Sequence, residues 1–397
     1  MRITTGMIFE KNLSLLQKQN SKMADASAQL SSGRRVLAPS DDPVAAARAL
    51  EVSQSQSVNR NYESNQGYAS DALSLVDSKL SAANDLVTYV RTRAVEAGNG
   101  SYSATELKAI ASDLGQQFTG LQSIANSQDS TGEYIFGGLR SNVQPFTGNI
   151  ASGVSYQGDQ GTRNLQISAS RSLPITSSGD EIFNTIRAPA GSAYLLGAAG
   201  NGGTALPSAM SLSGGYNGHS YAIEVGAGPS YTFYDNTNDP GHASPITPTV
   251  SVSGSDTTLS IPGISMTLSG VPATGDKFSL STVASAFDVL GSFVTALGSG
   301  NSAAARFSAK QTIAGMDATQ NSISQVQAGV GSRMVEVETQ QSISGDLGLQ
   351  YSNTMSRLQD ADYAKSISDL TQQKTYLEAS QQAFLKVSNL SLFNYLN

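Results

Sequence analysis

Cysteine and tryptophan are absent from this chain of 397 residues. Without cysteine, the chain has no disulfide framework, no thiolate metal ligand and no cysteine nucleophile. Its two histidines, His219 and His242, are too few for a multi-histidine metal site and supply little for imidazole acid–base catalysis. We therefore expect no catalytic residues, no metal and no cofactor, and a protein that is not an enzyme.

Charge is also scarce, because Asp, Glu, Lys and Arg make up only 14% of the chain and leave a net charge of −7. Nucleic acids and anionic membrane surfaces attract clustered positive charge, so neither is an expected partner. No run approaches the roughly 20 apolar residues of a membrane-spanning helix. The first residues resemble no secretion signal, which has an apolar segment and a small-residue cleavage site. We expect no membrane insertion. Because a composition rich in Ser and free of Cys and Trp is typical of extracellular proteins, we expect export without a cleaved signal peptide.

Proline is missing from two long stretches. Pro39 and Pro43 lie near the start, and the other ten prolines fall between Pro145 and Pro272. Since proline breaks helix interiors, residues 44–144 and 273–397 are free to form long helices. A heptad pattern of apolar residues supports this, and it predicts helices near residues 44–98 and 104–128. The heptad positions are Leu73, Val76, Leu80, Ala83, Val87, Val90 and Ala94.

Both ends of the chain carry an apolar stripe at helical spacing. Ordering a terminal helix costs more conformational entropy than the burial of one stripe returns, so such a helix is marginal alone. Plain core packing is the simplest explanation of any stripe, but these two lie where chains usually fray unless they are docked. We therefore predict that they form an assembly interface with other molecules. Its residues are Phe9, Leu13, Leu16, Met23, Leu30, Leu358, Tyr363, Ile367, Leu370, Leu377, Phe384, Leu390 and Phe393.

The middle of the chain has a different pattern. Short alternating runs, such as residues 153–156 and 220–225, are separated by Gly, Pro, Ser and Thr and predict a small all-β domain. Residues 197–215 are too rich in Gly, Ala and Ser for any element to be assigned. The expected fold class is α+β: both chain ends form a region of long helices, a coiled coil or bundle, and an all-β domain is inserted between them. The predicted regions are 1–43, 44–140, 141–285, 286–354 and 355–397.

Three local features of the middle region invite a chemical interpretation. Residues 235–241 resemble the start of a calcium loop, but Ile246 stands where a bidentate Glu belongs, so we interpret them as a turn. The glycine-rich residues 197–203 lack the Lys-Ser/Thr of a phosphate loop and are expected to be a flexible loop. Four tyrosines offer a possible carbohydrate-stacking face, which leaves a secreted adhesin as an alternative. They are Tyr216, Tyr221, Tyr231 and Tyr234.

Two motifs far apart in the chain resemble the signatures of the flagellin family. Residues 30–36, followed by 40–43, are similar to its N-terminal signature, and residues 356–364 are similar to its C-terminal signature. Further stretches, such as 132–138 and 391–396, resemble the hook–filament junction members of that family. The resemblance is weak over residues 188–285, and Pro43 departs from the small residue usual in flagellins. The signature residues are Ser32, Gly33, Arg34, Asp41, Asp42, Asp360 and Asp362.

The resemblance implies a structural subunit of the extracellular flagellum. It implies export through the flagellar type III channel and assembly through coiled coils of both chain ends. The implied partners are flagellin, the hook-side junction protein, further copies in a ring and a cytoplasmic export chaperone that covers the C-terminal helix. A flagellin-type filament subunit remains the alternative within the family.

Overall fold

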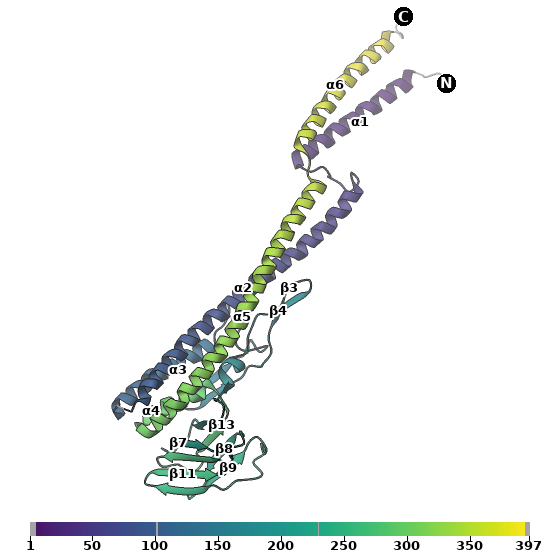
Figure 1. Ribbon diagram of the computed structural model, residues 1–397. Helices are drawn as coiled ribbons and strands as arrows, with labels where there is room; N and C mark the ends of the chain where they lie inside the picture. Colours follow the sequence, from purple (N-terminus) through teal and green to yellow (C-terminus); the bar gives the residue numbers. More distant parts are fainter. Residues whose placement is uncertain (1–4, 101, 229, 394–397) are drawn as a thin grey trace. The chain divides into compact units, whose positions relative to one another are not determined.

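The computed structural model describes residues 5–100, 102–228 and 230–393 (Figure 1). The chain folds as two compact units, one formed by residues 1–64 and 340–397 and the other by residues 65–339. Two long helices, α2 (Pro43–Gly98) and α5 (Ser302–Gln359), pass from one unit to the other. Below, the two units are called the terminal unit and the central unit.

The terminal unit is helical. Its outermost elements, α1 (Thr5–Ser32) and α6 (Tyr363–Phe393), lie side by side (Figure 1). The adjoining parts of α2 and α5 are also in contact, since the Asn59 side-chain amide donates a hydrogen bond to the Ser344 carbonyl at 2.8 Å. Helix α2 begins at Pro43 because Asp42 accepts a hydrogen bond from the Ala45 N–H at 2.9 Å.

The central unit holds a helical core built by α2, α3 (Ala104–Ala125), α4 (Ala286–Ser299) and α5. Helix α3 starts with a capping box between Ser103 and Glu106, and it ends at Ala125 rather than near residue 128. Each of the seven heptad positions from Leu73 to Ala94 is at most 1% exposed. That stripe is therefore core packing within one chain.

Part of the predicted β region belongs to this helical core. Short antiparallel pairs and a π-helical turn at Asp180–Asn184 pack against the helices through a cluster of aromatic rings, which includes Phe136, Phe146, Phe183 and Phe287. The predicted region 141–285 is thus divided between two cores. The paired strands are β1 (Phe146–Asn149) with β2 (Gly153–Tyr156), β3 (Asn164–Ser168) with β4 (Arg171–Pro174), and β5 (Ile186–Arg187) with β14 (Val283–Ala284).

The second core lies between two four-stranded antiparallel sheets, which together are called the sandwich below. Alternate residues such as Ile223, Phe233, Leu259 and Leu268 are fully buried there, as the period-two pattern predicts. One sheet has the order β10 (Thr249–Ser253), β11 (Asp256–Ile261), β12 (Ile264–Ser269) and β7 (Leu206–Leu212). The other has the order β6 (Tyr194–Gly197), β13 (Lys277–Ser281), β8 (Tyr221–Val225) and β9 (Tyr231–Asp235).

The α+β fold class is confirmed: along the chain, helices come first and last, and all the described strands lie between α3 and α4. Strand β7 lies inside the stretch 197–215, to which the sequence assigns no element. Its pairing with β12 defines it, and that pairing is non-local. Tyr221 and Tyr231 are 7% and 4% exposed and belong to the second core, so they do not form the carbohydrate-stacking face.

Candidate assembly interface

Helices α1 and α6 meet along a seam with coiled-coil spacing. The residues shielded from solvent recur at alternating intervals of three and four on each helix. The helices run antiparallel, because the rings of Phe9 and Phe384 lie 5.2 Å apart while Gln19 reaches Gln373 further along. The seam residues are Asn12, Leu16, Gln19, Met23, Ala26 and Leu30 on α1, and Ser366, Leu370, Gln373, Leu377, Ser380 and Phe384 on α6.

Almost half of the seam is polar. Gln19 Nε2 donates to Gln373 Oε1 at 2.5 Å near the middle of the pair, and Asn12, Ser366 and Ser380 also occupy seam positions. Polar residues at such positions fix register at a cost in stability. Leu377, with 7% of its surface exposed, is the most deeply buried residue of this seam. The two helices therefore hold each other in register but bury little apolar surface.

Large apolar side chains remain partly uncovered at and beside this seam. Phe9 contacts Phe384 at the end of the seam but is 48% exposed, and Leu13, four residues further along α1, is 42% exposed. On α6, Tyr363 and Ile367 share a face in the same way and are 57% and 53% exposed. We call these four side chains the open stripe. A helix pair with a half-polar seam and an open stripe is suited to binding further helices.

The structure divides the predicted interface residues into two groups. Leu16, Met23, Leu30, Leu370, Leu377 and Phe384 lie in the α1–α6 seam, whereas Phe9, Leu13, Tyr363 and Ile367 form the open stripe. Leu358 is half-buried near the end of α5. The side chains of Leu390 and Phe393 lie outside the described residues. Apolar spacing alone cannot separate the two groups, but Asn12 and Gln19, one heptad apart and in step with Leu16 and Met23, were a signal for the seam.

The two predicted signature motifs contact each other. Gly33, at φ +68°, ends α1 and directs the chain so that Arg34 forms an antiparallel bridge with Asp360. The Arg35 N–H donates to the Gln359 carbonyl at 2.6 Å, and the Ala361 N–H donates to the Gly33 carbonyl at 2.8 Å. The connectors α1–α2 and α5–α6 are thus joined by a short backbone ladder, which we call the joint.

The side chain of Arg35 adds two hydrogen bonds to the joint. Its guanidinium donates to Asp42 Oδ2 at 3.1 Å and to the Leu358 carbonyl at 2.9 Å. The Ala45 N–H and the Arg35 guanidinium hold the pKa of Asp42 below its usual value. Arg35 lies within the N-terminal motif at residues 30–36, but it is not among the signature residues predicted from the sequence. Its contact with Leu358 spans more than 300 positions, so only the folded chain reveals it.

The remaining signature residues organise the two connectors. Asp41 Oδ2 accepts hydrogen bonds from the N–H groups of Leu37 and Ala38 at 3.0 and 2.8 Å. Ser32 Oγ accepts one from the Arg34 N–H at 3.3 Å. Asp362 Oδ1 accepts one from the Lys365 N–H at 3.1 Å and so caps the start of α6. These residues shape the backbone rather than perform chemistry.

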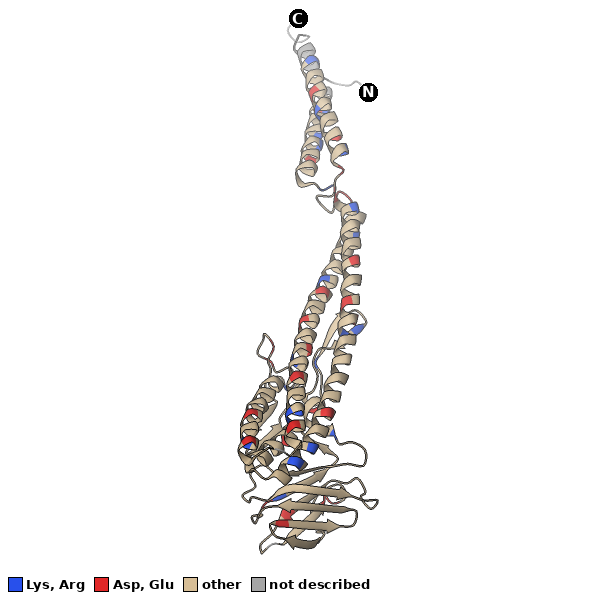
Figure 2. Ribbon diagram, turned by 60° about the vertical axis from the view of Figure 1, so that its left-hand side comes forward, with Lys and Arg blue, Asp and Glu red and all other residues tan. Residues whose placement is uncertain are grey.

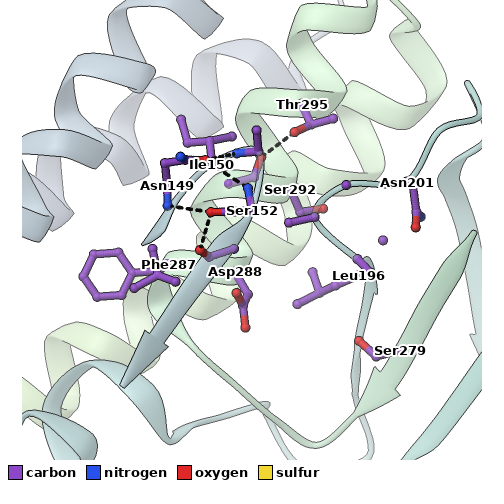
Figure 3. A pocket seen from close by; sticks show the side chains of 18 of the residues that line it. Asn149, Ile150, Ser152, Leu196, Asn201, Ser279, Phe287, Asp288, Ser292 and Thr295 are labelled. Atoms are coloured by element: carbon purple, nitrogen blue, oxygen red, sulfur yellow. Dashed lines mark hydrogen bonds between the residues drawn. The ribbon is translucent and has the colours of Figure 1, made fainter. Parts of the chain in front are cut away.

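A cavity of about 680 Å³ lies in the central unit (Figure 3). The α4 residues Asp288, Ser292 and Thr295 line one side, and the turn 149–153 and the loop 197–203 line the other. Burial raises the pKa of Asp288 to about 6, although the residue keeps contact with solvent inside the cavity. Asp288 is the only ionisable side chain in the lining, which provides no acid–base pair and no activated nucleophile. Across residues 5–100, 102–228 and 230–393, no group of three or more His, Asp or Glu is placed to hold a metal ion.

Comparison with known proteins finds similar flagellar proteins. Residues 3–141 match the bacterial flagellin N-terminal helical region. Flagellar hook-associated protein 3 of Salmonella typhimurium is 35% identical over 186 residues, which cover 47% of this chain and 58% of that protein. The protein of the same name from Escherichia coli is 27% identical over 393 residues, 99% of each chain. The crystal structure of Xanthomonas campestris FlgL superposes with a TM-score of 0.54 at 26% identity, covering 77% of this chain and 99% of that one.

These similarities support a hook–filament junction protein with a flagellin-type N-terminal region. They support a structural subunit of the bacterial flagellum, which is assembled outside the cell. In the part of the chain that the structure describes, no helix is both long enough and apolar enough to span a membrane.

Proposed function

We propose that this chain joins the flagellar hook to the filament by assembling through α1 and α6. The open stripe carries the proposal. Apolar side chains on both terminal helices stay exposed although the helices already pack against each other. Because each of these side chains is already about half covered, burying the rest in a neighbouring molecule returns roughly 0.8–1.5 kcal/mol. A weakly held helix pair gains most of its stability from such neighbours.

The joint gives this arrangement a defined geometry. Arg35 and the backbone ladder at Gly33 and Ala361 connect the two chain ends where the helix pair meets α2 and α5. Neighbours that bind the open stripe therefore act on both ends of the chain together. We propose that the signature residues serve this coupling and that the open stripe, Leu390 and Phe393 contact other subunits.

The proposed partners follow from a position between the hook and the filament. Flagellin would contact the filament side, the hook-side junction protein the other side, and further copies of this chain would complete a ring. Before export, a cytoplasmic chaperone would cover the apolar side chains of α6, such as Ile367 and Leu385, which are 53% and 61% exposed. The proposal includes export without a cleaved signal peptide and no enzymatic activity.

The test uses a strain in which the chromosomal copy is deleted and variants are supplied in its place. Leu13→Glu with Ile367→Glu puts charge into the open stripe without entering the seam. We expect this double variant to fold, with unchanged helical circular dichroism, but to leave cells non-motile with flagellin released into the medium. Val271→Glu, at a side chain 70% exposed in the central unit, is the matched control and should restore motility. Full motility of the double variant would refute assembly through the open stripe.

The same strain separates the alternatives. Loss of a filament subunit would remove filament protein altogether, whereas loss of a junction subunit leaves flagellin exported but not retained. A secreted adhesin would leave both motility and flagellin retention intact.

A further inference from the structure

Strand β10 forms one edge of the sandwich, and within the strand itself the usual protections of such an edge are missing, although Pro248 directly precedes it. Its five residues, Thr249–Ser253, are all exposed, and among the described strands it pairs with β11 alone. Natural edge strands are normally blunted by Lys, Pro or a bulge, because free N–H and C=O groups invite another strand. β10 contains no charged residue and no proline, and its pairing with β11 is regular. The strands of the sandwich carry few charges in general (Figure 2).

The register of the β10–β11 hairpin determines which backbone groups are free. Gly254 and Ser255 form a two-residue turn, with Gly254 at φ +62°, so Ser253 and Asp256 are a hydrogen-bonded pair. Hydrogen-bonded and non-hydrogen-bonded pairs alternate along an antiparallel ladder. Ser251, opposite Thr258, therefore points its N–H and C=O toward β11, while those of Val250 and Val252 point away from the sheet. Two residues of β10 thus offer both a donor and an acceptor to a further strand.

The valine side chains make this edge apolar on one face. Val250 and Val252 lie opposite Leu259 and Thr257, which are 0% and 5% exposed, so all four share the core-facing side of the sheet. The two valines are nevertheless 41% and 64% exposed. Val252 also lines a cavity of about 440 Å³ between the sheets, together with Val225 and Tyr231. The apolar face of the sheet therefore extends past the strands that cover it.

We propose that β10 pairs with β10 of a second copy of this chain. The sequence Thr-Val-Ser-Val-Ser reads almost the same in both directions about Ser251. Antiparallel pairing centred on Ser251 sets Val250 opposite Val252 of the second copy, and each such pair exchanges both of its free backbone hydrogen bonds. The four valines then form one apolar patch. No like charges meet, because the nearest charged residue in the hairpin is Asp256, beyond the turn.

This contact is distinct from assembly through the terminal helices. A two-fold contact of identical surfaces closes after two copies, so it does not propagate around a ring. The pairing does not depend on the proposed role of α1 and α6.

The absence of cysteine from the chain allows a direct test. In the proposed pairing, Ser251 faces Ser251 of the second copy in a non-hydrogen-bonded pair with Cα atoms about 4.5 Å apart. That separation is within the range that a disulfide bridges. We expect the full-length Ser251→Cys variant to form a disulfide-linked dimer under mild oxidation. The Ser253→Cys variant is the matched control, because its two copies would lie about 13 Å apart along the strands, and we expect at least about tenfold less dimer from it.

Two further substitutions test whether the disulfide-linked dimer depends on the free backbone groups of β10. Val252→Pro removes an outward N–H while leaving the β10–β11 ladder intact, and in the Ser251→Cys background it should abolish the dimer. Val335→Lys, at a side chain as exposed as Val252 but on α5, should leave the dimer unchanged. The proposal would be overturned if the Ser251→Cys and Ser253→Cys variants, each tested alone, formed equal amounts of disulfide-linked dimer. The proposal would also be overturned if Ser251→Cys formed no disulfide with itself but did form one with Ser211→Cys on β7 of another copy. Leu13→Glu with Ile367→Glu should not affect the cross-link, so failure of helix assembly and failure of this contact are distinguishable.

Discussion

Gly33 shows how one residue sets the course of the chain between α1 and α2. Its φ of +68° lies in the left-handed region that favours glycine, and a Cβ added there would come within 2.7 Å of the Tyr363 hydroxyl. The same turn aligns Arg34 with Asp360 and lets Arg35 reach the Leu358 carbonyl. The joint therefore depends on a backbone conformation that other residues adopt with strain.

Gly33→Ala should destabilise the terminal unit by about 1 kcal/mol, because alanine adopts the left-handed conformation with strain. Gly345→Ala is the matched control: Gly345 lies within α5 with open space around its Cα, so alanine should stabilise that helix by roughly 0.5–1 kcal/mol. Thermal unfolding followed by circular dichroism should show shifts of opposite sign. A Gly33→Ala midpoint equal to that of the parent chain would contradict the assigned role.

At the scale of elements, the α1–α6 pair is held by a seam in which apolar and polar residues are mixed. The Gln19–Gln373 hydrogen bond fixes the register of the two helices, while Leu377 supplies the best-buried apolar contact. A wholly apolar seam would make the pair stable by itself. The mixed seam keeps it dependent on neighbours, which suits a segment that is to be buried only on assembly.

Replacing both glutamines tests this balance. Gln19→Leu with Gln373→Leu should stabilise the helix pair and slow amide hydrogen exchange in α1 and α6, since an apolar seam packs better. Either single replacement should accelerate exchange, because the remaining glutamine loses its partner at a cost of about 1 kcal/mol. Gln17→Leu, on an exposed position of α1, should change exchange little. Faster exchange in the double variant would show that the hydrogen bond stabilises the pair more than apolar packing can.

At the scale of the whole molecule, stability is distributed unevenly between the two units. Both apolar cores consist of residues between 69 and 337 and so belong to the central unit. The terminal unit contributes few buried apolar residues, among them Ala45, Ala49 and Leu377. Segments with little buried apolar surface open at low free-energy cost.

Limited proteolysis of the soluble subunit should therefore cut residues 1–64 and 340–397 first and leave a resistant fragment close to 65–339. Mass spectrometry of the fragments identifies the cut sites. Incorporation into filaments should protect both chain ends, because neighbours then cover the open stripe. Cleavage within the sandwich before either chain end would contradict this distribution of stability.

Local patterns predicted much of the architecture. Proline-free stretches with heptad spacing anticipated α2 and α3, and alternation anticipated β2, β8 and β9, because both signals depend on residues close together in the chain. The pattern left β7 unassigned, and the pairing of β7 with β12 defines that strand. Spacing also predicted apolar stripes at both chain ends, but it did not separate the seam residue Leu370 from the exposed Ile367.

By itself, the sequence determined the fold class, the long helices, the family signatures and the shortage of catalytic groups, since composition and short-range periodicity carry all of these. Only the tertiary structure decided how the interface residues divide, why Arg35 matters and which sheet edge is left open. Each of these depends on which distant segments meet, and that outcome follows from the free energy of the whole fold rather than from any local pattern.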